Sequence, residues 1–461
     1  MNLSLYNTKT KSVEAFTPLN EGVVTMYACG PTVYDYTHIG HMRKYIGDDI
    51  LRRTLTLLGY SITHVMNITD VGHLTNDSDH GDDKFEAKAI SEGKSVWDIA
   101  DLYTDYFHKT MESVHVLPPT YETKATEHIA EMVALVEVLM QKGFAYETAE
   151  AIYFDVEKDA EYGKLSGQKV SDKFEGVRDD VVVDKDKKHP ADFALWFKRV
   201  GKFADHAMHW PNPSGIAGEG FPGWHIECSA MAMKYLGETI DIHTGGIDHI
   251  PVHHENEIAQ SECATGHEFV RFWVHHEFLN VDGEKMSKSK HNFYTIADIE
   301  GHNIDPLAVR LLTMQTSYRK PLNFTWDSLA AADAQLKKLQ KFASMQPSLG
   351  LIHDESLIRF TEALADDLNT AKALAVVWEM MSDTAIQDAD KWATLLSFDT
   401  VLGLNLADVE KFSITEDARA LATKRDEARA QKDYMLSDSL RAELEALGYT
   451  VLDTTEGTVL E

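Results

Sequence analysis

The chain has 461 residues, of which 44% are hydrophobic and 26% charged, and its formal net charge at pH 7 is -30. It is long enough for several globular domains, while the acidic surplus argues against tight non-specific binding to nucleic acid. Three cysteines are too few for a disulfide framework, no apolar run approaches the ~18 residues of a membrane span, and residues 1–12 are too polar for a signal peptide. We therefore expect a cytoplasmic protein without a membrane anchor.

The first part of the chain alternates between strand and helix signals. A buried strand is predicted over 23–29, an amphipathic helix over 41–59, a strand over 61–69 and a helix over 97–114. This alternation is typical of a parallel sheet that binds ligands at the carboxyl ends of its strands. We expect a Rossmann-type α/β domain.

The rest of the chain predicts an insertion into this sheet, the second half of the sheet, and then helices. A charged stretch over 169–189 marks the insertion, and the Pro- and Gly-rich segment after Trp210 marks the return to the sheet. The expected elements in chain order are a helix over 125–143, a strand over 151–156, a helix over 224–236, a strand over 238–243, a helix over 254–265, a strand near 271–279, helices over 306–315, 326–346, 355–368 and 370–387, and a helical pair over 418–447.

A first short motif, His38-Ile39-Gly40-His41, opens the helix that follows the first strand. Gly40 lets an adenine ring approach the backbone, and the imidazoles of His38 and His41 can donate to phosphate oxygens beside the positive end of the helix. Taken alone, the motif is equally consistent with an ordinary helix N-terminus that happens to contain histidines.

A second motif, Lys285-Met286-Ser287-Lys288-Ser289, lies in a loop after a strand of the second half. Lys285 and Lys288 can close over a triphosphate, and Ser287 and Ser289 add hydroxyl donors. Alone, this is equally a solvated basic turn. Together, in this order and each at a strand exit, the two motifs predict ATP binding and stabilisation of charge that develops on the α-phosphate.

Four residues have the chemistry of a metal site. Cys29 ends a strand, Cys228 lies in a predicted helix, and the i, i+4 spacing of His253 and Glu257 places both on one helical face. Two thiolates, an imidazole and a carboxylate are a plausible zinc set. Their wide separation in sequence leaves open the alternative of two buried cysteines and a surface histidine.

Several sequence segments resemble the class I aminoacyl-tRNA synthetases, and among them the cysteinyl-tRNA synthetases, from Leu3 to about Gly457. Besides the loop at Lys285, the matching segments are Met26–Asp35, Asn67–Val71, Asp192–Trp196, Pro222–Met231 and His253–Ser261. The resemblance implies that L-cysteine is activated with ATP and Mg²⁺ to cysteinyl-adenylate and then transferred to the 3′-terminal adenosine of tRNA(Cys). It also implies that His38, His41, Lys285 and Lys288 stabilise the transferring phosphate.

The resemblance further implies one Zn²⁺ per chain, held by Cys29, Cys228, His253 and Glu257. Zinc would distinguish cysteine from serine because it binds a thiolate strongly and a hydroxyl weakly.

Other positions gain roles in the same way. Thr69, Trp224 and His225 would lie near the amino acid, and Asp248 would accept hydrogen bonds from the ribose. The alternatives are core packing for Trp224 and a hydrogen-bonded core imidazole for His225.

The resemblance also suggests how the chain is divided and which partner it binds. The expected segments are 1–117 and 210–280 for the two halves of the catalytic domain, 118–209 for a connective insertion, 281–325 for the Lys285 loop and a tRNA stem-contact region, 326–410 for a helical tRNA-binding bundle, and 411–461 for a small C-terminal domain. A monomer is the working expectation. The candidate basic track for tRNA is Arg319, Lys320, Lys337, Lys338, Lys341, Lys424, Arg425, Arg429 and Lys432, and its alternative is a solvated helix face with neighbouring acids.

Two departures from the family pattern leave questions open. Gly72–Gly81, which contains His73, Asp77, Asp79 and His80, is either a polar surface loop or a second metal site. Lys290-His291 adds charge to the loop after Lys288. Two other functions remain as alternatives: a ligase that joins cysteine to an amino sugar, and a non-catalytic tRNA-binding paralogue.

Overall fold

The computed structural model describes residues 2–72, 74–76, 80–168, 184–287, 290, 292–454 and 457–460. Lys288 and Ser289 of the second motif and His291 just after it lie outside these residues, as do His73, Asp77 and Asp79 of the Gly72–Gly81 segment. No helix in the described part is long and apolar enough to cross a membrane.

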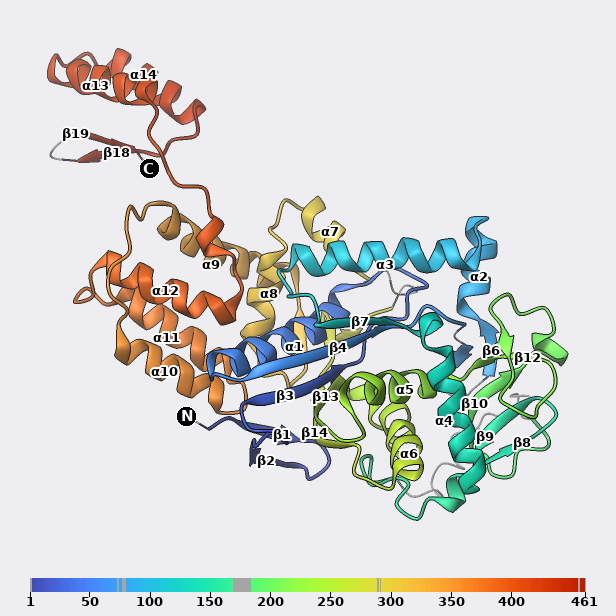
Figure 1. Ribbon diagram of the computed structural model, residues 1–461. Helices are drawn as coiled ribbons and strands as arrows, with labels where there is room; N and C mark the ends of the chain where they lie inside the picture. Colours follow the sequence, from blue (N-terminus) through green and yellow to red (C-terminus); the bar gives the residue numbers. More distant parts are fainter. Residues whose placement is uncertain are drawn as a thin grey trace.

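A five-stranded parallel sheet forms the centre of the molecule (Figure 1). Its spatial order is β14-β13-β3-β4-β7, and every neighbouring pair is parallel. The strands are β3 (Val23–Ala28), β4 (Ser61–Ile68), β7 (Tyr121–Lys124), β13 (Ile240–Gly246) and β14 (Val270–His276). The order reverses between β3 and β13, so this is a switch point, where such sheets bind ligands.

Helices cover both faces of this sheet. Figure 1 shows α1 above the strands and α5 with α6 below them. The helix α1 buries Ile39, Met42, Ile46 and Ile50, an i, i+3, i+7, i+11 stripe, against the core. The helices of this part are α1 (Ile39–Leu57), α2 (Lys84–Glu92), α3 (Val96–Ser113), α4 (Ile129–Lys142), α5 (Trp224–Leu236) and α6 (His253–Thr265), and two hairpins accompany them, β1 (Ser4–Asn7) with β2 (Ser12–Ala15) and β5 (Leu74–Asn76) with β6 (His80–Asp83).

The insertion is a separate antiparallel sheet of order β11-β12-β10-β9-β8. Its strands are β8 (Ala145–Glu147), β9 (Ala151–Phe154), β10 (Phe193–Lys198), β11 (Trp210–Pro211) and β12 (Glu219–Pro222). The boundaries expected at 118–209 therefore need correction: β7 belongs to the parallel sheet, and β11 and β12 belong to the insertion. The short, mostly polar β7 and the Pro-containing β11 and β12 lack the apolar alternation that identifies a strand from sequence.

Every helix predicted from periodicity after the second motif is present. This region contains the sheet β15 (Leu279–Val281), β16 (Glu284–Lys285) and β17 (Leu322–Phe324), and the helices α7 (Ile296–Gly301), α8 (Leu307–Met314), α9 (Trp326–Ser344), α10 (Asp354–Ala365), α11 (Thr370–Ser382) and α12 (Asp388–Leu402). The helices α7 and α12 were not predicted. The expected α/β fold, split by an insertion and followed by a helical region, is confirmed.

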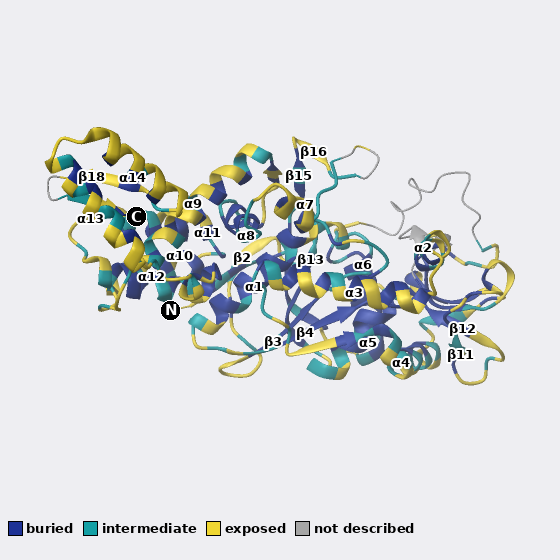
Figure 2. Ribbon diagram, turned by 90° about the horizontal axis from the view of Figure 1, so that it is seen from above, coloured by how far each residue is buried: buried dark blue, intermediate teal, exposed yellow. Residues whose placement is uncertain are grey.

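A small C-terminal unit follows the bundle. It consists of α13 (Glu416–Ala430), α14 (Tyr434–Ala446), β18 (Val451–Thr454) and β19 (Gly457–Leu460). Figure 1 shows it joined to the rest by a single segment, and in Figure 2 α13 and α14 are mostly exposed whereas β3 and β4 are mostly buried.

A buried charge cluster ties α1 to the helical region. The carboxylate of Asp49 accepts hydrogen bonds from Arg53 Nε (2.7 Å) and from Arg310 Nη2 (2.5 Å). Arg310 also donates to backbone carbonyls at Leu402 and Val114. The helix that begins at the first motif is thus fixed to the C-terminal end of α12.

Candidate active site

A pocket of about 460 Å³ lies at the carboxyl ends of β3, β4 and β13, at the switch point of the sheet. It unites residues that are far apart in sequence. Of the predicted site residues, those that line it are Cys29, His38, Gly40, His41, Thr69, Trp224, Cys228, Asp248, His253 and Lys285.

The two imidazoles of the first motif cap the N-terminus of α1. The backbone N–H of His41 donates to Nδ1 of His38, and the backbone N–H of His38 donates to Nδ1 of His41, each over 3.3 Å. The rings are stacked with centroids 3.6 Å apart. Because each Nδ1 accepts a hydrogen bond, the proton of each neutral ring is on Nε2.

Desolvation lowers the pKa of His41 to about 4, with Asp248 opposing the shift and Lys44 adding to it, although the residue keeps exposed surface at the mouth of the pocket. His41 is therefore neutral at pH 7 and offers a hydrogen-bond donor without a charge. A Cβ at Gly40 would lie 2.9 Å from two atoms of the His38 ring. Glycine is required here because the imidazole folds back over the first turn of the helix.

Lys285 lies on the short strand β16 at the rim of the pocket. Its Nζ is 5.5 Å from the ring centroid of Phe278, and the side chain is exposed. The backbone N–H of Ser287 donates to Oδ1 of Asn292 over 2.8 Å, so the chain folds back just after the lysine.

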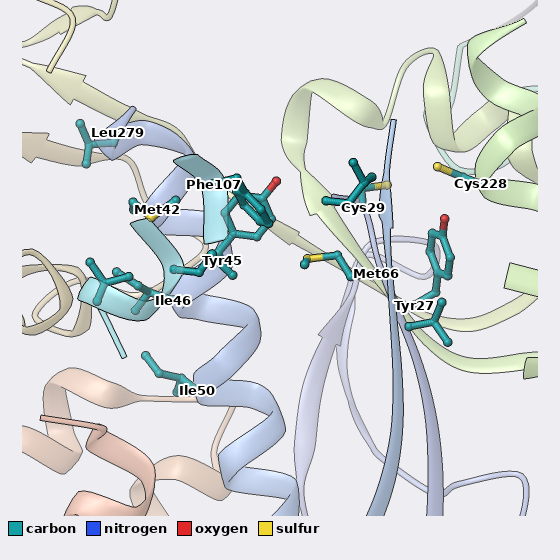
Figure 3. Packing of buried hydrophobic residues seen from close by; sticks show 14 of the residues in the cluster. Tyr27, Cys29, Met42, Tyr45, Ile46, Ile50, Met66, Phe107, Cys228 and Leu279 are labelled. Atoms are coloured by element: carbon teal, nitrogen blue, oxygen red, sulfur yellow. The ribbon is translucent and has the colours of Figure 1, made fainter. Parts of the chain in front are cut away.

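The four predicted metal donors meet at the base of the pocket. The ligand atoms of Cys29, Cys228, His253 and Glu257 all lie within 4.8 Å of one another, and all four residues are buried. In Figure 3 the sulfur atoms of Cys29, at the end of β3, and Cys228, on α5, face each other. The sheet and two helices thus assemble a donor set that has no local sequence spacing.

A second, overlapping donor set includes residues that the sequence analysis did not select. Cys29 and Glu257 also lie within 4.8 Å of His243 and His254. His243 Nε2 lies 2.9 Å from Oε2 of Glu257, and His254 Nε2 lies 3.3 Å from Sγ of Cys29. The first set differs in that Cys29, Cys228 and His253 all line the pocket, which gives a ligand direct access.

The cluster is electrostatically coupled. Burial opposes ionisation, but the neighbouring His243 and His253 lower the pKa of Glu257 to about 2. Burial also disfavours the charged form of His253, but Glu257 and Cys228 outweigh this effect and raise the pKa of His253 to about 10. A hydrogen bond with Cys29 and burial raise the pKa of Cys228. Two thiols this close cannot both ionise unless a cation lies between them.

A chain of neutral histidines supports the cluster from behind. His254 Nδ1 lies 2.7 Å from His275 Nε2, and His275 Nδ1 lies 2.7 Å from the hydroxyl of Thr8. Burial lowers the pKa of both histidines well below the usual value, so they orient one another as neutral rings.

The residues expected near the amino acid occupy different depths. Trp224 lines the pocket with its ring centroid 4.3 Å from that of His253. His225 is fully buried, and its Nδ1 lies 2.8 Å from Nδ1 of His253, so it contacts the metal donors instead of the open pocket. Thr69 lines the pocket and donates to Oε2 of Glu227 over 2.8 Å.

Glu227 is a functional candidate that the sequence analysis missed. Burial raises its pKa to about 8, and its Oε1 has no hydrogen-bond partner among the described residues. Its position next to Cys228 was the only sequence signal.

Four described residues of the expected basic track form ion pairs. Arg425 is buried and donates to Asp453 over 2.7 Å, and Arg429 pairs with the same carboxylate. Arg319 pairs with Asp367 over 2.7 Å, and Lys337 pairs with Asp333 over 2.6 Å. For these four, the alternative of helix faces with neighbouring acids describes the structure better.

Comparison with known proteins agrees with this geometry. The family described as "tRNA synthetases class I (C) catalytic domain" matches residues 15–334, and the "DALR domain" matches residues 359–407. Cysteine–tRNA ligase 1 of Burkholderia lata is 43% identical over 99% of this chain and 96% of its own length, and cysteine–tRNA ligase of Treponema denticola is 40% identical over 98% of each. The Mycobacterium tuberculosis methionyl-tRNA synthetase structure in complex with methionyl-adenylate has a TM-score of 0.57 at 15% identity, covering 83% of this chain and 90% of that one.

The parallel sheet, its switch-point pocket and the match over 15–334 define a class I tRNA synthetase. Since its relatives are about 40% identical over nearly their whole length, the chain belongs to the cysteine–tRNA ligase family.

Proposed function

We propose that this chain activates L-cysteine with ATP and transfers it to tRNA(Cys). The observation that most supports this is a single pocket lined by two thiols and an imidazole, with the carboxylate of Glu257 next to them, and by the histidine-capped N-terminus of α1. The end of the pocket at Cys29 and Cys228 suits a thiol, and the end at the N-terminus of α1 suits a phosphate. Joining the two needs the carboxylate of the amino acid to meet the α-phosphate between them.

In the first step a carboxylate oxygen of cysteine attacks the α-phosphorus, and the bond to the β-phosphate oxygen breaks as pyrophosphate leaves with the electron pair. The Nε2–H groups of His38 and His41 donate to the oxygens where charge builds up, assisted by the positive end of α1. Lys285 and Lys288 neutralise the triphosphate together with Mg²⁺.

Gly40 leaves room for the nucleotide and Asp248 accepts from the ribose. In the second step a hydroxyl of the terminal ribose of tRNA attacks the carbonyl carbon of the adenylate, and AMP leaves.

Cys29, Cys228, His253 and Glu257 would hold the family's Zn²⁺. The fit is supported by Glu257: its Oε2 is taken by His243, whereas Oε1 makes no hydrogen bond of proper geometry with any described residue, although His253 Nε2 is 2.9 Å away. When bound, zinc supplies a soft Lewis acid that favours a thiolate over a serine hydroxyl. The hydrogen bond from His243 leaves Glu257 one oxygen for the metal, so we expect it to be the weakest ligand.

Two assays test the reaction. Cysteine-dependent exchange of pyrophosphate into ATP should occur, and labelled cysteine should be transferred to tRNA(Cys). Exchange without transfer to tRNA, but with transfer to an amino sugar, would favour the related amino-sugar ligases. Absence of exchange would favour a non-catalytic tRNA-binding protein.

The metal assignment is tested by comparing Cys228→Ser with His254→Asn. If the pocket-facing set holds zinc, Cys228→Ser should lose most bound zinc and cysteine affinity, whereas His254→Asn should retain a metal shell with two sulfurs in X-ray absorption. The reverse pattern would assign the metal to the set of Cys29, His243, His254 and Glu257.

A further inference from the structure

A lysine outside both motifs lies in the wall of the pocket. Lys44, one turn after His41 on α1, lines the pocket, and its side chain is only 12% exposed. Its ammonium contacts the backbone carbonyl of Cys29 and lies 2.8 Å from Oδ2 of Asp48. Oδ1 of Asp48 in turn lies 2.9 Å from Nε2 of His276. Helix α1 therefore brings a charged donor to the residue that ends β3.

This ammonium retains the capacity for a further hydrogen bond. An ammonium has three N–H donors, and within the described residues Lys44 donates one to the carbonyl of Cys29 and forms an ion pair with Asp48, whose Oδ2 accepts no hydrogen bond from a described residue. The ammonium also lies 4.6 Å from the ring centroid of Tyr45. Because the side chain lines the pocket, a substrate group can accept a remaining N–H.

The position of Lys44 is between the two ends of the pocket. It touches the backbone of Cys29, whose thiol belongs to the metal donor set. Lys44 also follows His41 by three residues on α1, which puts it one helical turn from the imidazole on the nucleotide side, and both residues line the pocket.

The group that must lie between these ends is the carboxylate of the amino acid. In cysteine the carboxyl carbon is three bonds from the sulfur, so a thiol held at Cys29 and Cys228 keeps the carboxylate close to the end of β3. A cation at that point attracts the carboxylate and repels the α-ammonium group of the substrate, so it fixes which of the two faces the α-phosphate.

We propose that Lys44 binds one carboxylate oxygen of the amino-acid substrate and so presents the other carboxylate oxygen to the α-phosphate of ATP. This inference rests on the proposed function, since it needs a thiol substrate held by the cysteine pair. Asp48 and His276 then act as positioning residues that hold the ammonium in place.

The test uses three thiols that differ in one group each. Cysteine has a carboxylate and an amine, cysteamine lacks the carboxylate, and 3-mercaptopropionate lacks the amine. Lys44→Gln retains an N–H donor for the Cys29 carbonyl and removes the charge. Affinities are measured by equilibrium competition, alongside zinc content and melting temperature.

We expect Lys44→Gln to weaken binding of cysteine and of 3-mercaptopropionate by roughly 10- to 100-fold, the range of a lost charged hydrogen bond, and to change cysteamine binding by less than about twofold. Equal weakening of all three thiols would overturn the proposal in favour of a structural role at Cys29. Unchanged affinity for all three would overturn it as well.

A second variant guards against misfolding caused by an unpaired buried Asp48. The double change Lys44→Gln with Asp48→Asn removes both charges, and it should show the same selective loss for the two carboxylate-bearing thiols. Failure of the wild-type chain to bind any of the three thiols would instead contradict the proposed function.

Discussion

Replacing Asp49 by Asn tests how strongly the buried charge cluster joins α1 to the helical region. Asp49 and Arg310 have side chains that are 1% and 0% exposed. Oδ2 accepts from both Arg53 and Arg310, and Oδ1 accepts from the backbone N–H of Leu117 over 3.0 Å. In either orientation an Asn amide would point its NH₂ group at one of these donors and leave two buried guanidinium groups without their counter-ion.

Breaking a buried ion pair on one side costs about 3–5 kcal/mol. At roughly 2 °C per kcal/mol for a large domain, the melting temperature of the Asp49→Asn variant should fall by about 6–10 °C in differential scanning calorimetry. The matched control is Glu379→Gln, which breaks the exposed pair between Arg359 and Glu379. An exposed pair contributes at most ~1 kcal/mol, so the control should shift by no more than about 2 °C. A shift for Asp49→Asn no larger than that of the control would refute the reasoning.

Three further outcomes are expected. Gly40→Ala places a methyl group against the His38 ring, so exchange activity should fall by about 10²-fold with little change in melting temperature; an unchanged rate would contradict the need for the folded-back imidazole. Burial disfavours the charged form of His206, but Asp83, 3.0 Å away, outweighs this effect and raises the pKa of His206. The ion pair therefore stabilises the fold fully below about pH 6.5, the pKa of an unfolded histidine. This stabilisation is lost as the pH rises through the pKa of the folded state. The melting-temperature difference between wild type and His206→Gln should therefore shrink as the pH rises above about 6.5, and a difference that does not change with pH would contradict this role. Dialysis against a zinc chelator should abolish cysteine-dependent exchange and zinc should restore it, whereas full activity without metal would exclude the role given to Cys228.

Local sequence was sufficient for most elements and for both motifs. The periodicity that predicted α1 reports a stripe buried against the core, and this signal is contained in the residues themselves. In α5 and α6 the buried residues instead run consecutively, over 225–232 and 253–261, so these helices are buried nearly all round. The carboxyl-end position of Cys29 followed from the strand that it ends. The polar strand β7 escaped prediction because an edge strand needs little apolar alternation.

Tertiary structure decided how the site is assembled. Residue type made Cys29 and Cys228 plausible zinc ligands and the family resemblance paired them, but no local spacing joins them, and the switch point of the sheet is what brings them together. Tertiary structure also identified Glu227, His254 and Lys44 as site residues, because their contacts in the site are with residues distant in the chain. A sequence determines which faces are buried through short-range periodicity, whereas a site built where several strands end depends on long-range packing, which only the fold specifies.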